Sequence, residues 1–101
     1  MKATIIVEGT FTEDYQIFFN EYSERVRNFL LKNDAEIIRR QLIEKTLIGE
    51  YKPSLVMIID FPSKKIAETI FQEQEYLDIV PLREKVFKDF RMFLVEYTLP
   101  N

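Results

Sequence analysis

Residues 55–83 read LVMIIDFPSKKIAETIFQEQEYLDIVPLR, and this stretch decides the fold. It opens with seven residues that are almost all apolar and then breaks at Phe61-Pro62-Ser63. An apolar run of this length between turn signals is typical of a buried strand, whereas the apolar residues that follow recur at helical spacing. The stretch therefore predicts a strand over 55–61 and two short amphipathic helices joined near Glu75-Tyr76.

The remainder of the chain predicts three more strands and one long helix. We first expect a strand over 3–8 that ends at Gly9 with positive φ, and then a helix capped by Thr12 that ends near Asn33 in a left-handed conformation. A strand over 35–48 with a bulge and the strand over 55–61 follow. The chain closes with a helix capped by Ser63, a helical piece and a strand over 92–99, and the inward residues of the helical piece are Ile79, Leu82, Val86, Phe87 and Phe90. This βαββαβ order predicts a ferredoxin-like α+β domain over residues 1–101, in which an antiparallel sheet carries its helices on one face.

The two central strands of that sheet are apolar on both sides. In the strand over 55–61, Leu55, Met57, Ile59 and Phe61 point to one side and Val56 and Ile58 to the other, and in the first strand Ile5 and Val7 oppose Ile6. Each large aliphatic side chain left in water forgoes roughly 1.5 to 3 kcal/mol. We therefore expect a second copy to cover this face in a two-fold homodimer, against the alternative that a few exposed aliphatic residues are ordinary.

Composition and charge exclude several classes of protein. The net charge is −3, and the 14 basic residues are scattered, whereas a nucleic-acid footprint needs a concentrated positive face. The strand over 55–61 is aliphatic and acidic, unlike the stacking strand of RNA-recognition modules with the same element order. The N-terminal apolar stretch is short and broken by Glu8, so we expect no membrane span and a cytoplasmic protein.

Residue types that carry much of enzyme chemistry are missing. The chain has no histidine and no cysteine, which excludes imidazole bases, thiolate nucleophiles and histidine ligation of zinc or haem iron. Gly9 and Gly49 are the only glycines, too few for a P-loop or a dinucleotide fingerprint. We expect no cofactor and no metal site, with Glu73 and Glu75 as solvated helix surface.

Several motifs together resemble a known family. They are the segment PSLVMIIDFPS at 53–63, Glu75-Tyr76, Pro81-Leu82-Arg83 and FLVEY at 93–97, and the similarity covers nearly the whole chain. They resemble a family of small bacterial proteins of unknown function in the dimeric α+β barrel superfamily. The chain departs from such relatives near Arg40-Gln41, where they often carry a glycine pair. The resemblance implies a ferredoxin-like homodimer and a pocket between sheet and helices for a small organic ligand, but no reaction.

Aromatic and basic residues supply the candidate ligand-binding groups. Tyr15 and Tyr22 are a heptad apart on the first helix, so both rings should face the sheet, as core aromatics or as donors to a ligand. Tyr76 and Arg83 fit the family's pattern and would either hold a ligand carboxylate or, through an Arg83 pair with Asp60 or Glu75, fix the helix junction.

Two further positions stay open at this stage. Arg39 and Arg40 are adjacent, so one points outward while the other, for which we take Arg40, could enter the barrel. Asp60 ends the third strand and is the catalytic candidate, as a general base with a pKa raised by burial, or else it caps the next turn or pairs with an arginine.

The sequence thus supports two main hypotheses. The first is a homodimer that binds a small organic molecule without an assigned reaction. The alternative is a cofactor-independent oxygenase or isomerase, in which Tyr15, Tyr22, Asp60 and Arg83 converge on one cavity. A purely structural role would instead leave a filled core and an exposed patch elsewhere.

Overall fold

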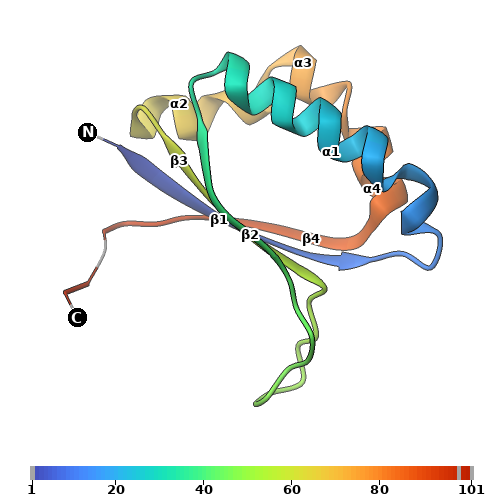
Figure 1. The fold of residues 1–101 in the computed structure, drawn as a ribbon. Helices are drawn as coiled ribbons and strands as arrows, with labels where there is room; N and C mark the ends of the chain where they lie inside the picture. Colours follow the sequence, from blue (N-terminus) through green and yellow to red (C-terminus); the bar gives the residue numbers. More distant parts are fainter. Residues whose placement is uncertain (1, 98, 101) are drawn as a thin grey trace.

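A four-stranded sheet and a layer of helices make up the computed structural model, which describes residues 2–97 and 99–100. The elements are β1 (Ala3–Phe11), α1 (Tyr15–Lys32), β2 (Glu36–Leu42), β3 (Leu55–Phe61), α2 (Lys64–Thr69), the 3-10 turn η1 (Ile70–Gln72), α3 (Gln74–Leu77), α4 (Val80–Val86) and β4 (Phe87–Leu94). All the helices lie on one face of the curved sheet (Figure 1). The predicted ferredoxin-like α+β order is confirmed.

The strands are antiparallel and follow the order β2-β3-β1-β4, so β1 and β3 are central as predicted. Ile5 lies opposite Ile59, and Ile6 lies opposite Ile58. Residues that oppose one another in an antiparallel pair point to the same side of the sheet, and their neighbours point to the other. The register therefore sorts every residue of β1 and β3 onto one of two faces.

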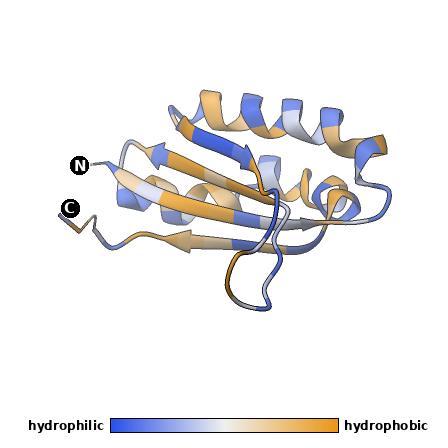
Figure 2. Ribbon diagram, turned by 60° about the horizontal axis from the view of Figure 1, so that its bottom comes forward, coloured by the Kyte–Doolittle hydropathy of each residue, from blue (hydrophilic) through white to orange (hydrophobic). Residues whose placement is uncertain are grey.

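The face of the sheet toward the helices forms the core. Burial alternates strictly along β1 and β3, with Ile5 4% exposed, Val7 2% and Ile59 1%. Apolar residues run along the strands in Figure 2. From the helical layer, Phe29, Leu30, Ile79 and Val86 are buried against this face, each with 2% exposure or less. The core thus lies between one face of the sheet and one face of each helix.

Gly9 has a different role from the one predicted. It lies inside β1, opposite Leu55, and Gly49 is the only glycine among the described residues with positive φ, at 103°. A Cβ built on Gly9 would lie 2.5 Å from the ring of Phe87, too close for any side chain. Gly9 is therefore needed for the close approach of an aromatic ring and not for a turn.

Helix α1 ends at Lys32 with Asn33 as its C-cap, as predicted, but its N-cap and the left-handed residue after it differ from the predicted ones. The N-cap is Asp14, and the Thr12 hydroxyl instead donates a hydrogen bond of 2.7 Å to the Lys85 carbonyl, which ties the turn before α1 to α4. After the helix, Asn33 has φ of −100°, and Asp34 is the left-handed residue with φ of 58°. Asn33 instead donates from Nδ2 to the Phe29 carbonyl at 2.9 Å and so satisfies an end carbonyl of the helix.

The second strand is shorter than predicted. The register shifts between Ile37 and Arg39, which confirms the bulge, but β2 ends at Leu42, opposite Leu55. Residues 43–54 form a loop that extends past the sheet, away from the helices (Figure 1). Pro53 has no backbone N–H, so strand pairing cannot simply continue beyond this point.

The predicted boundary between the last helix and the last strand is wrong. Helix α4 ends at Val86, and β4 begins at Phe87, with Phe87 opposite Phe11 and Phe90 opposite Gly9. A spacing of three residues suits a helix, whereas in a regular strand Phe87 and Phe90 would point to opposite faces. The register shift opposite Thr10 and Phe11 turns both rings toward the helices. The strand ends at Leu94, and Thr98 of the predicted 92–99 strand lies outside the described residues. None of the described helices is both long and apolar enough to span a bilayer.

The face of the sheet away from the helices is uncovered in the single chain. Ile6, Val56 and Ile58 are only half-buried there, and Phe93, opposite Ile6, is 47% exposed. Further large apolar side chains project from the 43–54 loop and the C-terminal segment, namely Leu47, Ile48, Tyr97 and Leu99. The chain therefore leaves an apolar row in the middle of its outer sheet face.

Candidate functional site

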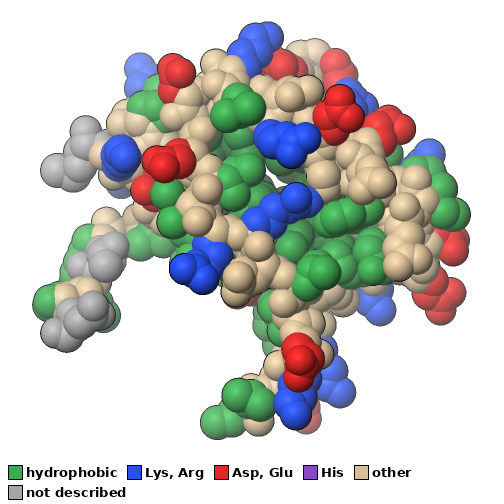
Figure 3. Space-filling view, viewed as in Figure 1, with side chains coloured by type: hydrophobic (Ala, Val, Ile, Leu, Met, Phe, Trp, Pro, Cys, Tyr) green, Lys and Arg blue, Asp and Glu red, His purple; other side chains and the backbone are tan. Residues whose placement is uncertain are grey.

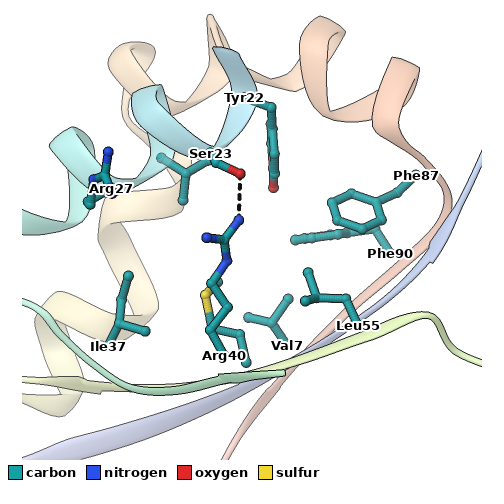
Figure 4. Close-up of a pocket in the computed structure, with 11 residues that line it drawn as sticks. Val7, Tyr22, Ser23, Arg27, Ile37, Arg40, Leu55, Phe87 and Phe90 are labelled. Atoms are coloured by element: carbon teal, nitrogen blue, oxygen red, sulfur yellow. Dashed lines mark hydrogen bonds between the residues drawn. The ribbon is translucent and has the colours of Figure 1, made fainter. Parts of the chain in front are cut away.

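A cavity lies between α1 and the sheet. It measures about 40 Å³ as space open to the centres of water-sized molecules, enough for roughly three waters. Its lining residues come from α1 and all four strands: Val7, Tyr22, Ser23, Val26, Arg27, Ile37, Arg40, Leu55, Met57, Phe87 and Phe90. Figure 4 shows polar groups from α1 and β2 above an apolar floor, and Figure 3 shows basic and apolar side chains together around a hollow.

Tyr22 places a phenol in this cavity. Its side chain is 6% exposed and meets Phe87 edge to face, with ring centroids 5.5 Å apart. The hydroxyl points into the space between helix and sheet (Figure 4). Burial raises the pKa of Tyr22 far above its usual value, aided by Tyr76 and opposed by Arg83 and Arg40. Tyr22 is therefore a neutral hydrogen-bonding group at physiological pH.

Arg40 reaches the same space from the sheet. Its Nη2 donates a hydrogen bond to the Ser23 hydroxyl, and its guanidinium lies 5.2 Å from the ring centroid of Phe19. The bulge in β2 decides its direction, because Arg40 opposes the inward Met57 while Arg39 opposes the outward Ile58. The structure thus places Arg40 in the lining of the cavity and Arg39 on the other face, a choice that the sequence left open.

Tyr76 and Arg83 lie behind the cavity wall. Arg83 Nη1 donates to the Tyr76 hydroxyl at 3.0 Å, and the Arg83 guanidinium lies 4.8 Å from the ring centroid of Phe90. Tyr76 lines a smaller cavity of about 20 Å³, whose wall shares Tyr22 and Phe90 with the first. Among the described residues, Arg83 forms no pair with a carboxylate, which was one of the two alternatives at this position. It instead bonds to Tyr76 and packs against the ring of Phe90.

Tyr15 lies outside the cavity. Its ring stacks on Phe11 with centroids 3.9 Å apart and planes 4° from parallel, and it borders open grooves beside Leu42. The heptad spacing to Tyr22 does turn Tyr15 toward the sheet, but its ring packs on Phe11 and does not line the cavity. It acts as a packing residue in this structure.

Asp60 lies on the opposite side of the sheet from the cavity. It opposes Thr4, whose hydroxyl donates a hydrogen bond of 2.6 Å to Asp60 Oδ1. The predicted convergence of Tyr15, Tyr22, Asp60 and Arg83 on one cavity is therefore wrong, because only Tyr22 of the four lines it. Asp60 cannot act as a base on a molecule held between α1 and the sheet.

Sequence reasoning missed Ser23, Val26 and Arg27. A signal was present, since Phe19, Ser23 and Arg27 are four residues apart and lie on one stripe of α1 beside Tyr22 and Val26. The described residues contain no cluster of acidic side chains able to hold a metal ion. The cavity therefore offers hydrogen-bond donors and apolar walls, and no carboxylate.

Comparison with known proteins gives a family and a fold. A family model described as "Domain of unknown function (DUF1330)" matches residues 2–98. Among curated proteins, none matches the chain.

Solved structures share the fold at low sequence identity. A protein of unknown function from Rhodopseudomonas palustris has a TM-score of 0.78 at 14% identity, over 98% of this chain and 84% of that one. A dimeric protein of unknown function and ferredoxin-like fold from Bacteroides fragilis has 0.64 at 10%, over 95% and 96%. SnoaB, a cofactor-independent oxygenase from Streptomyces nogalater, has 0.64 at 15%, over 99% and 98%. At these identities the likeness concerns the fold alone.

Proposed function

We propose that the protein is a homodimer that binds a small organic molecule between α1 and the sheet. The chain belongs to the DUF1330 family, whose function is unknown, so the proposal rests on the geometry of the chain itself. The observation that carries this proposal is the arrangement of Tyr22 and Arg40, whose polar groups face one largely apolar cavity from the helix and from the sheet. Polar groups placed in this way at the side of an apolar cavity orient a bound molecule.

The walls of the cavity support binding of an organic molecule. Most of the lining is aliphatic or aromatic, and a few polar groups converge at one side. Small-molecule sites in proteins have this composition, with apolar walls for affinity and a few placed polar groups for orientation. The molecule would be small, since a larger one would have to displace Phe90 or Arg40.

The outer face of the sheet supports the dimer. Phe93, Ile6 and Ile58 form an apolar row across its centre, and Glu8 with Arg91 forms the neighbouring polar row. Two copies packed sheet against sheet would cover the apolar row, as obligate dimers cover their apolar interfaces. The fold neighbour from Bacteroides fragilis is described as dimeric, which favours the same assembly here.

A second candidate is a cofactor-independent oxygenase or isomerase, and its support is the fold shared with the Streptomyces enzyme. Such chemistry needs a group that removes a proton. The cavity lining holds no carboxylate, the chain has no histidine, and burial raises the pKa of Tyr22, which makes this phenol a poor base. Binding therefore fits the site better than catalysis.

Native mass spectrometry of freshly purified protein tests the proposal. We expect a mass of twice 12.2 kDa plus a small adduct that disappears on denaturation. A matched variant, Val26→Phe, narrows the cavity from α1 and should stay dimeric but lose the adduct. A protein that is monomeric at micromolar concentration, or whose adduct survives in Val26→Phe, would contradict the proposal. The cytoplasmic location expected from the sequence stays a prediction, which fractionation of cells would test.

A further inference from the structure

We infer that the molecule held between α1 and the sheet is a small organic carboxylate with a short apolar tail, bound through Arg40 and Tyr22 at its charged end. This inference rests on the proposed function and names the ligand class of the same site. It comes from the charge, the free donors and the size of the cavity.

The charge of the cavity is one-sided. Two arginines, Arg27 and Arg40, contribute to its lining, both as exposed residues, so the cationic side of the cavity is open to solvent, and no aspartate or glutamate lines it. Neither arginine forms a salt bridge with a carboxylate of residues 2–97 or 99–100, whereas Lys32 and Arg91 both do. In a chain of net charge −3, two cations without acidic partners beside one cavity favour an anionic ligand.

Donors remain available for that anion. A guanidinium has five N–H donors, and Arg40 uses its Nη2 to reach Ser23. Figure 4 shows the Arg40 guanidinium and the Tyr22 hydroxyl facing the same space from opposite layers. A planar carboxylate placed there can accept from the guanidinium with one oxygen and from the neutral phenol with the other.

The rest of the cavity is apolar and limits the size of the ligand. Leu55, Phe87 and Phe90 lie beyond the polar groups and have nothing to offer a second charge. Space for roughly three water-sized molecules is close to the size of a two-carbon carboxylate, and a chain of four carbons fits when the exposed Arg40 side chain moves outward. The phosphate ion is polar on all sides and would leave these walls in contact with its oxygens, which favours the carboxylate.

Titration of the dimer with sodium butyrate tests the inference, by calorimetry and by shifts of backbone amide signals in NMR spectra. Butyramide and inorganic phosphate are the comparison probes. We expect butyrate to bind at least ~10-fold more tightly than either, because a charge-assisted hydrogen bond contributes more than a neutral one. Equal binding of butyramide would overturn the carboxylate assignment while leaving the small-molecule pocket in place, and equal binding of phosphate would overturn the apolar tail.

Variants locate the binding groups. Arg40→Gln should weaken butyrate binding ~10-fold or more, with part of the affinity kept in Arg40→Lys, and Tyr22→Phe should weaken it several-fold. The matched control is Arg39→Gln, which removes the same charge from the neighbouring residue on the other face of the sheet and should change affinity less than ~2-fold. Loss of affinity in Arg39→Gln equal to that in Arg40→Gln, or no butyrate binding by the wild-type dimer, would contradict the inference.

Discussion

The two faces of the sheet carry similar apolar residues in different surroundings. On the face toward the helices, Ile5 and Ile59 are 4% and 1% exposed, whereas their neighbours Ile6 and Ile58 on the other face are half-buried. The inner face is covered by the chain's own helices (Figure 1), whereas on the outer face Tyr51 from the 43–54 loop lies over Arg91 and the row of Phe93, Ile6 and Ile58 keeps exposed surface. The hydrophobicity of the residues does not distinguish the two faces, whereas the register of the strands shows which residues lie on each face.

The comparison also separates stability from function. The inner face is well packed except beside Tyr22 and Arg40, where the cavity interrupts it. The outer face has polar pairs, such as Thr4 with Asp60, around its apolar row. The proposed ligand binding would use the gap in the inner face, and the proposed self-association would use the row on the outer face.

The largest expected effect compares neighbouring isoleucines. Ile59→Ala removes buried atoms from the core and should lower the free energy of unfolding by about 2 to 5 kcal/mol. Ile58→Ala, the matched control on the outer face, should cost less, and its cost should depend on protein concentration because it acts through the dimer. Urea unfolding at two protein concentrations measures both. If the two variants lower the free energy of unfolding equally, and by amounts that do not depend on protein concentration, the distinction between the two faces is wrong.

A smaller effect is expected at Gly9. Gly9→Ala places a methyl group against the Phe87 ring, so the ring must move, at a cost of about 1 to 3 kcal/mol. Thr10→Ala, the next residue, points to the other face and should change stability by about 0.5 kcal/mol or less. Thermal unfolding of the two variants compares them, and a neutral Gly9→Ala would show that Phe87 does not pack as described.

The smallest expected effect is a pH dependence. Burial raises the pKa of Tyr22 above its value of about 10 in the unfolded chain, so the folded state keeps this proton longer. Stability from Tyr22 is therefore fully present below pH 10 and falls as pH rises above it, by up to about 1.4 kcal/mol per pH unit. Tyr22→Phe should lose less stability than the wild type between pH 9 and 11 in urea unfolding. Parallel losses would mean that the phenol is accessible to solvent.

Much of the fold could be predicted because β1 and β3 are short, β-branched apolar runs between turn signals and Ser63 caps the start of α2. The boundary at Phe87 could not be predicted, since the spacing of Val86, Phe87 and Phe90 suits a helix and a strand holds Phe87 and Phe90 on one face only through the register shift opposite Thr10 and Phe11. The end of β2 was set by Pro53 on the partner side of the hairpin, which local sequence around Leu42 does not reveal.

The site could be predicted only in part. Tyr22 and Arg40 were identified, but the inward direction of Arg40 depends on the bulge at Ile37–Arg39, whose position the residues do not fix. Asp60 was misjudged although its alternation with Ile58 already places it on the outer face. Parity along a strand was therefore a better guide to that carboxylate than its position at the strand end.

The most direct test of the account is light scattering on the purified protein at micromolar concentration, alongside two variants. Phe93→Asp puts a charge into the apolar row, and Ile17→Asp makes the same kind of change on the exposed surface of α1, where Ile17 is 73% exposed. We predict twice 12.2 kDa for the wild type and Ile17→Asp, and 12.2 kDa for a folded Phe93→Asp. A wild-type monomer, or a Phe93→Asp protein that remains dimeric, would contradict the claim that a second copy covers the outer face.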